Sequence, residues 1–101
     1  MKLIKLLAAT TAVAVLLAAP AYAQTRIALV VKSLGNGFFD AANKGAQEAA
    51  AELGDVEVIY TGPTAATAEA QIEVVNALIA QQVDAIAISA NDPDALVPAL
   101  Q

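Results

Sequence analysis

Beyond its first 23 residues, the chain alternates short apolar runs with longer segments in which apolar residues recur at helical spacing. The short runs are rich in Val, Ile and Ala, which is typical of strands that are covered on both faces. The expected strands are residues 26–32, 56–60 and 85–89, and the expected helices are residues 38–53, 67–83 and a segment that begins near Asp94. This alternation predicts an α/β fold, a partial doubly wound parallel sheet (βαβαβα) with helices on both faces and right-handed crossovers.

Local signals mark the ends of the predicted helices and the packing face of the first one. Gly54 supplies a left-handed stop after the first helix, and Thr67 has the side chain of an N-cap for the second. One face of the first helix consists of small residues, namely Ala42, Gly45, Ala46 and Ala49. We expect this face to lie close against the sheet.

The first 23 residues have the three parts of a cleavable signal peptide. Lys2 and Lys5 give a positively charged start, an apolar run follows, and Pro20 precedes the Ala-x-Ala cleavage site at positions 21–23. A transmembrane anchor is the alternative, because the uncharged stretch is long enough to be considered. Pro20 and the cleavage site favour removal, so we expect export to the periplasm and a mature chain that starts near Gln24.

Charge and composition exclude several classes of function. The whole chain has ten acidic and five basic residues, and it has no His and no Cys. Without Lys2 and Lys5, three basic residues remain against ten acidic ones, so a basic nucleic-acid-binding surface is excluded. The missing His and Cys exclude Cys/His zinc sites, thiol nucleophiles and Ser-His-Asp triads. The apolar content is too high for disorder, but much of it is Ala, which buries little area and predicts a marginal core.

The candidate binding residues lie where open parallel sheets bind ligands, beyond the carboxyl ends of the strands. The segment after the first strand contains Lys32, Asn36, Phe38 and Phe39. An aromatic ring stacks on the apolar face of a sugar, while Lys and Asn side chains hydrogen-bond its hydroxyl groups. This combination favours a small polyol over a phosphate, since the Gly-x-Gly around Asn36 lacks the further residues of phosphate loops. Asn91, after the third strand, completes the candidate ligand-binding set.

Several of these residues also have a structural interpretation. Lys32 can extend its aliphatic stem to the rim of the sheet and place its charge in water. One of the two Phe residues is expected to pack into the core as the first anchor of its helix. Asp92 and Asp94 could form a metal or acid/base pair, but capping of the third helix explains both, and we prefer capping.

Four runs of the sequence carry a resemblance to a known family. They are residues 26–32 (RIALVVK), 34–39 (LGNGFF), 60–64 (YTGPT) and 86–100 (IAISANDPDALVPAL). They resemble the amino-terminal lobe of periplasmic sugar-binding proteins of the ribose-binding type, the substrate-binding subunits of ABC importers. Within that family the chain is most similar to the rhamnose-binding branch, which is itself similar to the autoinducer-2-binding protein.

The resemblance implies a signal peptide at residues 1–23, followed at residues 24–101 by an incomplete N-terminal lobe of a type I periplasmic binding protein. The two lobes of such a protein close on one sugar. Phe38 and Phe39 match the aromatic pair that lines the sugar, Asn36 matches a polar contact, and Lys32 matches a ligand-contacting Lys of the autoinducer branch.

The implied function is that of the substrate-binding component of a carbohydrate ABC importer. Rhamnose is the favoured monosaccharide, a permease in the inner membrane is the implied partner, and neither catalysis nor a cofactor or metal is expected. Binding of autoinducer-2 is the alternative within the family. Presentation of the liganded form to a chemoreceptor or kinase is the alternative from another class.

The resemblance also implies the strand order two-one-three, with a further strand next to the third one. In this chain that fourth strand would lie past Gln101. We therefore expect an unpaired apolar edge at residues 85–89, and we expect residues 24–101 alone to aggregate or associate rather than to bind sugar.

Overall fold

The computed structural model describes residues 24–101, and these form six elements of secondary structure in the predicted order. The elements are β1 (Thr25–Val30), α1 (Gly37–Leu53), β2 (Val56–Thr61), α2 (Ala68–Ala80), β3 (Ala85–Ile88) and α3 (Pro93–Leu100). Each lies within a few residues of its predicted range, so the α/β fold is confirmed. The predicted signal peptide lies outside the described residues. Within residues 24–101, no helix has both the length and the apolar character needed to cross a membrane.

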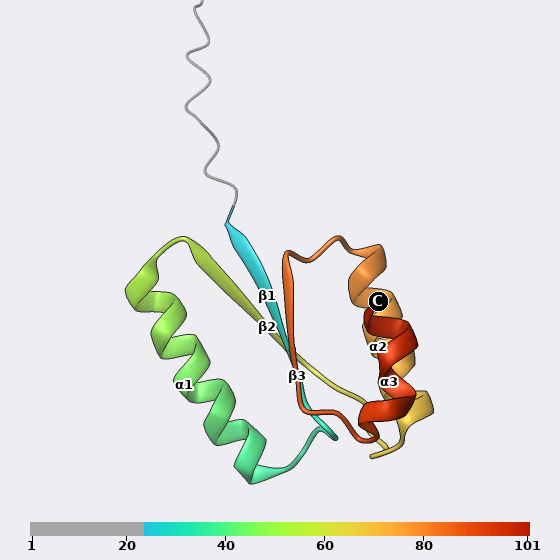
Figure 1. Ribbon diagram of the computed structural model, residues 1–101. Helices are drawn as coiled ribbons and strands as arrows, with labels where there is room; N and C mark the ends of the chain where they lie inside the picture. The colour runs from blue at the N-terminus through green and yellow to red at the C-terminus, as the bar shows by residue number, and fades with distance from the viewer. Residues whose placement is uncertain (1–23) are drawn as a thin grey trace, which may run out of the picture.

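The three strands form one parallel sheet in the predicted order β2-β1-β3 (Figure 1). Ile27 of β1 lies opposite Val58 of β2 and Ala85 of β3, so these residues share one face of the sheet. All carboxyl ends point toward the same edge, which is the lower edge in Figure 1. Within the described residues, β3 pairs with β1 alone, so its outer edge carries no neighbouring strand, as expected.

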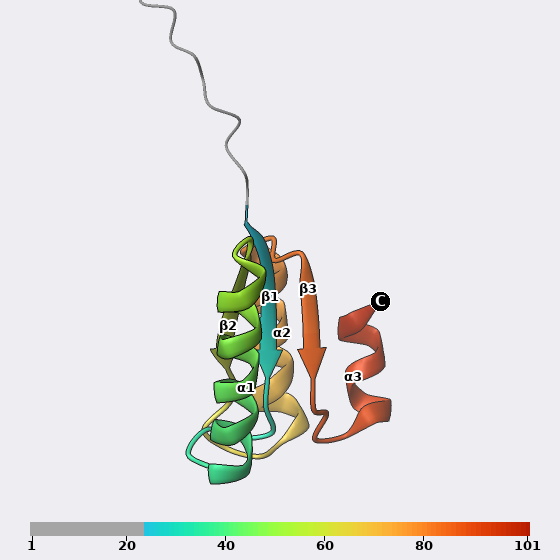
Figure 2. The ribbon, with the colours of Figure 1, turned by 90° about the vertical axis from the view of Figure 1, so that its left-hand side faces the viewer.

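Different helices cover the two faces of the sheet. Figure 1 shows α1 on one side and α2 with α3 on the other, and Figure 2 shows the strands side by side with α3 next to β3. Ala28 and Val30 of β1 are fully buried in a core cluster with Leu78 of α2. The partly buried residues packed against this cluster are Ile59, Val74, Val83, Ile86 and Ile88. The core that positions the site therefore lies between the sheet and α2.

The predicted packing face of α1 is wrong, because the helix is rotated about its axis and packs against the sheet with a different set of residues. Ala42, Gly45 and Ala49 are exposed, whereas Ala50 is buried and Phe39, Asn43 and Ala46 are half-buried. Polar contacts with the edge strand β2 explain the difference. They are the bond from the Tyr60 hydroxyl to Asp40 Oδ1 (3.0 Å) and the bond from Gln47 Nε2 to the Val58 carbonyl (3.1 Å). These two bonds hold α1 along β2 with Ala42, Gly45 and Ala49 turned toward solvent.

The helix ends follow the predicted signals. Gly54 has a left-handed backbone (φ 80°), and its N–H donates to the Ala50 carbonyl. The Thr67 hydroxyl accepts a hydrogen bond from the N–H of Ala70 (3.3 Å), as an N-cap does. Asp92 Oδ1 accepts from the N–H groups of Asp94 (3.0 Å) and Ala95 (3.2 Å), so the expected capping by Asp92 is confirmed.

Candidate functional site

The three loops that follow the strands meet at the carboxyl edge of the sheet. The loop after β1 is tied to the end of β2, because the N–H of Val31 donates to the Thr61 carbonyl and the N–H of Leu34 donates to the Pro63 carbonyl. Gly62 lies against Val31 so closely that a Cβ atom on Gly62 would be 3.0 Å from the Val31 carbonyl oxygen. The first two loops are thus in direct contact beneath the candidate binding residues.

Gln71 of α2 joins the ends of β1 and β3 from inside the protein. Its side chain is fully buried, and its Nε2 donates to the carbonyls of Val31 (3.1 Å) and Ser89 (2.8 Å). Its Oε1 accepts from the N–H of Asn91 (2.8 Å). Sequence reasoning missed this residue. The available signal was a polar side chain in helical phase with the buried Val75 and Leu78.

Asn91 continues this network across the second loop. Its Nδ2 donates to the backbone carbonyls of Lys32 (3.0 Å) and Thr67 (3.3 Å). Thr67 ends the loop between β2 and α2, so a single amide group connects all three strand-end loops. The structure thus places Asn91 at the predicted edge, with its amide protons directed to the backbone.

Asn36 begins α1 as its N-cap, a role the sequence analysis did not assign. Its Oδ1 accepts from the N–H of Phe38 (2.9 Å), and its backbone carbonyl accepts from the N–H groups of Phe39 and Asp40. Capping therefore occupies the side-chain oxygen. The Nδ2 group is the part of Asn36 that could donate to a ligand hydroxyl.

The two phenylalanines differ in their exposure. Phe38 is 75% exposed, whereas Phe39 is half-buried on the face of α1 that meets the sheet. Their ring centroids are 5.3 Å apart in an edge-to-face arrangement. Phe39 thus takes the part of the expected anchor, although it is only half-buried. Phe38 presents a large apolar ring to solvent at the start of α1, where such exposure marks a candidate contact surface.

Lys32 is exposed, although it directly follows the buried Val31. Within the described residues there are two ion pairs, Arg26 with Glu57 and Lys44 with Glu48, and Lys32 takes part in neither. Its backbone carbonyl is fixed by Asn91, so the origin of the side chain is held at the carboxyl edge. The ammonium group can serve a ligand there or extend into water.

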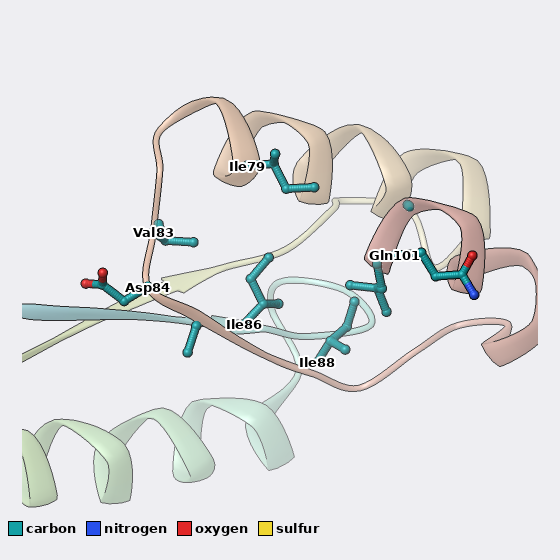
Figure 3. Close-up of a pocket in the computed structure, with 9 residues that line it drawn as sticks. Ile79, Val83, Asp84, Ile86, Ile88 and Gln101 are labelled. Atoms are coloured by element: carbon teal, nitrogen blue, oxygen red, sulfur yellow. The ribbon is translucent and has the colours of Figure 1, made fainter.

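A concave surface lies along the free edge of β3. It is lined mainly by aliphatic side chains of β3, α2 and α3, including Ile79, Ile86, Ile88 and Leu100 (Figure 3). Ile79 and Leu100 are each about half exposed there. The residues that line this groove include no aromatic ring that could stack on the apolar face of a polyol.

Comparisons with known proteins agree with the fold. A sequence model of the periplasmic binding protein domain matches residues 27–101. The solute-binding protein of an ABC transporter from Clostridium phytofermentas, solved with bound L-rhamnose, is 42% identical with a TM-score of 0.70. The alignment with it covers 76% of this chain and 24% of that one.

Two further solved structures are similar. LsrB from Clostridium saccharobutylicum, in complex with AI-2, is 36% identical with a TM-score of 0.71, over 74% of this chain and 23% of that one. An ABC transporter solute-binding protein from Agrobacterium vitis, bound with α-D-tagatopyranose, is 35% identical with a TM-score of 0.73, over 76% of this chain and 26% of that one. The chain spans about a quarter of the length of these proteins. Their likeness and the matched domain show that the chain belongs to the periplasmic binding protein family, with the fold of the amino-terminal lobe of its type I members.

Proposed function

We propose that this chain supplies part of the sugar site of a substrate-binding protein that serves a carbohydrate ABC importer. In this proposal, residues 24–101 form the first part of the N-terminal lobe, and residues 1–23 are a signal peptide that directs export to the periplasm. The observation that carries the proposal is the exposed ring of Phe38 at the carboxyl edge of the sheet, in the loop and helix start that also hold Lys32 and Asn36. Solved relatives with bound tagatopyranose and L-rhamnose support a sugar as the ligand.

The role of each residue follows from its chemistry. The ring of Phe38 stacks on the apolar face of the sugar, and Phe39 supports that ring from the side. The Lys32 ammonium and the Asn36 amide donate to hydroxyl oxygens. Closure of a second lobe removes the sugar from water, and the closed form docks on the permease in the inner membrane.

L-Rhamnose is the favoured ligand in this proposal. The relative that binds it shares 42% of aligned residues with the chain. Autoinducer-2 is the second candidate, because LsrB, solved with AI-2, is 36% identical to the chain in sequence. Its TM-score is similar to that of the rhamnose-bound relative. Both are small polar molecules for which an exposed ring and an ammonium group are suitable partners.

The test is calorimetric titration of a protein that contains this chain together with the second lobe, with L-rhamnose, D-allose, D-tagatose and autoinducer-2. Phe38→Ala should weaken binding of the preferred ligand by about 1–3 kcal/mol through lost stacking and burial. Leu53→Ala is the matched control, because Leu53 is also a largely exposed apolar residue, at the other end of α1. Unchanged affinity of the folded Phe38→Ala variant would remove the aromatic contact from the proposal. Failure of the protein to bind any of the four ligands would refute the proposal as a whole.

A further inference from the structure

We propose that Gln71 and Asn91 form a positioning unit that fixes the three strand-end loops for ligand binding, with Gln71 making no contact with the ligand. The inference rests on the proposed function, because it concerns how the proposed sugar site is held in shape. It also gives Asn91 a different role from the ligand contact that the sequence suggested.

The hydrogen-bonding capacity of Gln71 is directed entirely to the protein. A glutamine side chain has two N–H donors and one carbonyl acceptor. Both donors reach backbone carbonyls, those of Val31 and Ser89, and the acceptor takes the N–H of Asn91. The side chain is also fully buried, so no surface of it is left for a sugar. An effect of Gln71 on affinity must therefore act through the residues that it holds.

The hydrogen bonds of Gln71 lie just beyond the point where the pairing of β1 with β3 ends. The last paired residues of β1 and β3 are Val30 and Ile88, and the ladder closes with the bond from the Ser89 N–H to the Val30 carbonyl (2.9 Å). Beyond that point the two strands have no further backbone bonds to each other in the described residues. Gln71 takes over there, because it bridges the Val31 and Ser89 carbonyls. The strand ends stay in register for another residue.

Asn91 connects Gln71 to the backbone of the candidate binding residue Lys32. Its backbone N–H is fixed by Gln71, and its side chain in turn fixes the carbonyls of Lys32 and Thr67. The Lys32 carbonyl belongs to the residue whose ammonium group is proposed to meet the sugar. A shift of this backbone by a fraction of an ångström moves the ammonium away from its best position, and ligand affinity depends steeply on such positions.

Two variants and one control test the inference in the same protein that contains both lobes. Gln71→Met keeps the shape of the side chain and removes its amide, and Asn91→Ala removes the bonds to Lys32 and Thr67. Gln47→Met is the control, because Gln47 also donates a side-chain amide bond to a strand carbonyl, that of Val58, away from the strand-end loops. The measurements are the affinity for L-rhamnose, D-allose, D-tagatose and autoinducer-2, and the exchange of backbone amide protons without ligand.

We expect Gln71→Met and Asn91→Ala to weaken binding of the preferred ligand about tenfold or more, and Gln47→Met to change it less than about twofold. The Asn91 amide proton should exchange faster in Gln71→Met than in the unaltered protein, because its acceptor is gone. A merely structural role would lower the unfolding midpoint of Gln71→Met while leaving the affinity of the folded protein unchanged.

Equal affinities of the unaltered protein and both folded variants would overturn the inference alone. If Gln71→Met does not fold, Asn91→Ala decides. Weaker binding together with faster amide exchange throughout the three loops supports positioning. Weaker binding with unchanged exchange indicates a direct contact by Asn91 and overturns it. If the unaltered protein binds none of the four ligands, the proposed function itself fails, and the inference falls with it.

Discussion

Replacing Gly62 with Ala should destabilise the protein although it adds only one methyl group. Gly62 follows β2 directly and packs against Val31 at the end of β1. A Cβ atom at this position would lie 2.8 Å from Val31 Cγ2 and 3.0 Å from the Val31 carbonyl oxygen. Optimal contacts between carbon atoms are about 3.5–4.0 Å, so the distance to Val31 Cγ2 is well inside the repulsive range. The distance to the carbonyl oxygen is also tighter than an ordinary contact.

The neighbours of Gly62 cannot easily make room. Val31 is 1% exposed, so its side chain is enclosed on all sides. Its N–H donates to the Thr61 carbonyl, and its carbonyl accepts from Gln71. Moving Val31 away would therefore stretch two hydrogen bonds at the carboxyl edge of the sheet. Overpacking of this kind costs about 1–3 kcal/mol, and we expect the free energy of unfolding to fall by that amount.

Gly45→Ala is the matched control for this prediction. Gly45 lies inside α1, and no heavy atom is within 4 Å of an added Cβ there. Ala is favoured over Gly in a helix interior by about 0.5–1 kcal/mol, so Gly45→Ala should stabilise the protein. Urea unfolding followed by circular dichroism measures both variants. A Gly62→Ala midpoint equal to or above that of the unaltered protein would show that the ends of β1 and β2 separate freely, and the close-packing argument would be refuted.

Three further predictions concern single side chains. Gln82 has a left-handed backbone (φ 57°), so Gln82→Gly should stabilise the protein by about 0.5–1 kcal/mol in urea unfolding, whereas Gln81→Gly, at φ −80°, should give no gain. Asp92→Ala removes two cap bonds and should cost about 0.5–2 kcal/mol by the same assay, and Asp92→Asn should retain most of that stability. Removal from water, and then the hydrogen bond to the Asp40 carboxylate and its charge, raise the pKa of Tyr60 above its usual value. A raised folded-state pKa means that the stability contributed by the neutral phenol is complete below about pH 10 and is lost as the pH rises through that folded-state value. Spectrophotometric titration should therefore show a lower Tyr60 pKa in Asp40→Asn, with Tyr60→Phe to identify the signal, and an unchanged pKa would contradict the contact.

The order of elements could be predicted because its signals are local. Strand and helix periods, the Gly54 stop and the Thr67 cap each depend on a few neighbouring residues, and the structure confirms them. The rotation of α1 could not be predicted in the same way. It depends on hydrogen bonds that Asp40 accepts from, and Gln47 donates to, a strand that begins after the helix has ended. The small residues on the other face gave a competing pattern.

The candidate site was predictable in location but not in its internal order. The predicted ends of the first strand and the first helix put Lys32 and Phe38 at the carboxyl edge, and the structure has both residues there. Ligand binding at this edge stays a prediction. Gln71 was missed because a single glutamine within a helix is usually a surface residue. Its partners Val31 and Ser89 are 40 and 18 positions away in the sequence, so its burial becomes visible only when the strands are placed side by side.

At the carboxyl edge of the sheet, amide side chains make many of the hydrogen bonds that connect the loops. This affects which residues of the proposed site can determine ligand specificity. Asn36 caps α1, while Gln71 and Asn91 hold the backbone between the loops. An amide suits this task because it carries donors and an acceptor without a net charge, so it can be buried once its bonds are made. In the proposed site, such a frame of amides fixes the positions of Lys32 and Phe38, whereas Gln71 at its centre has no exposed surface for a ligand. Loops held this way can present different side chains without losing their geometry. That property is compatible with relatives solved with AI-2, tagatopyranose and L-rhamnose, and it directs the search for specificity to the exposed side chains rather than to the buried frame.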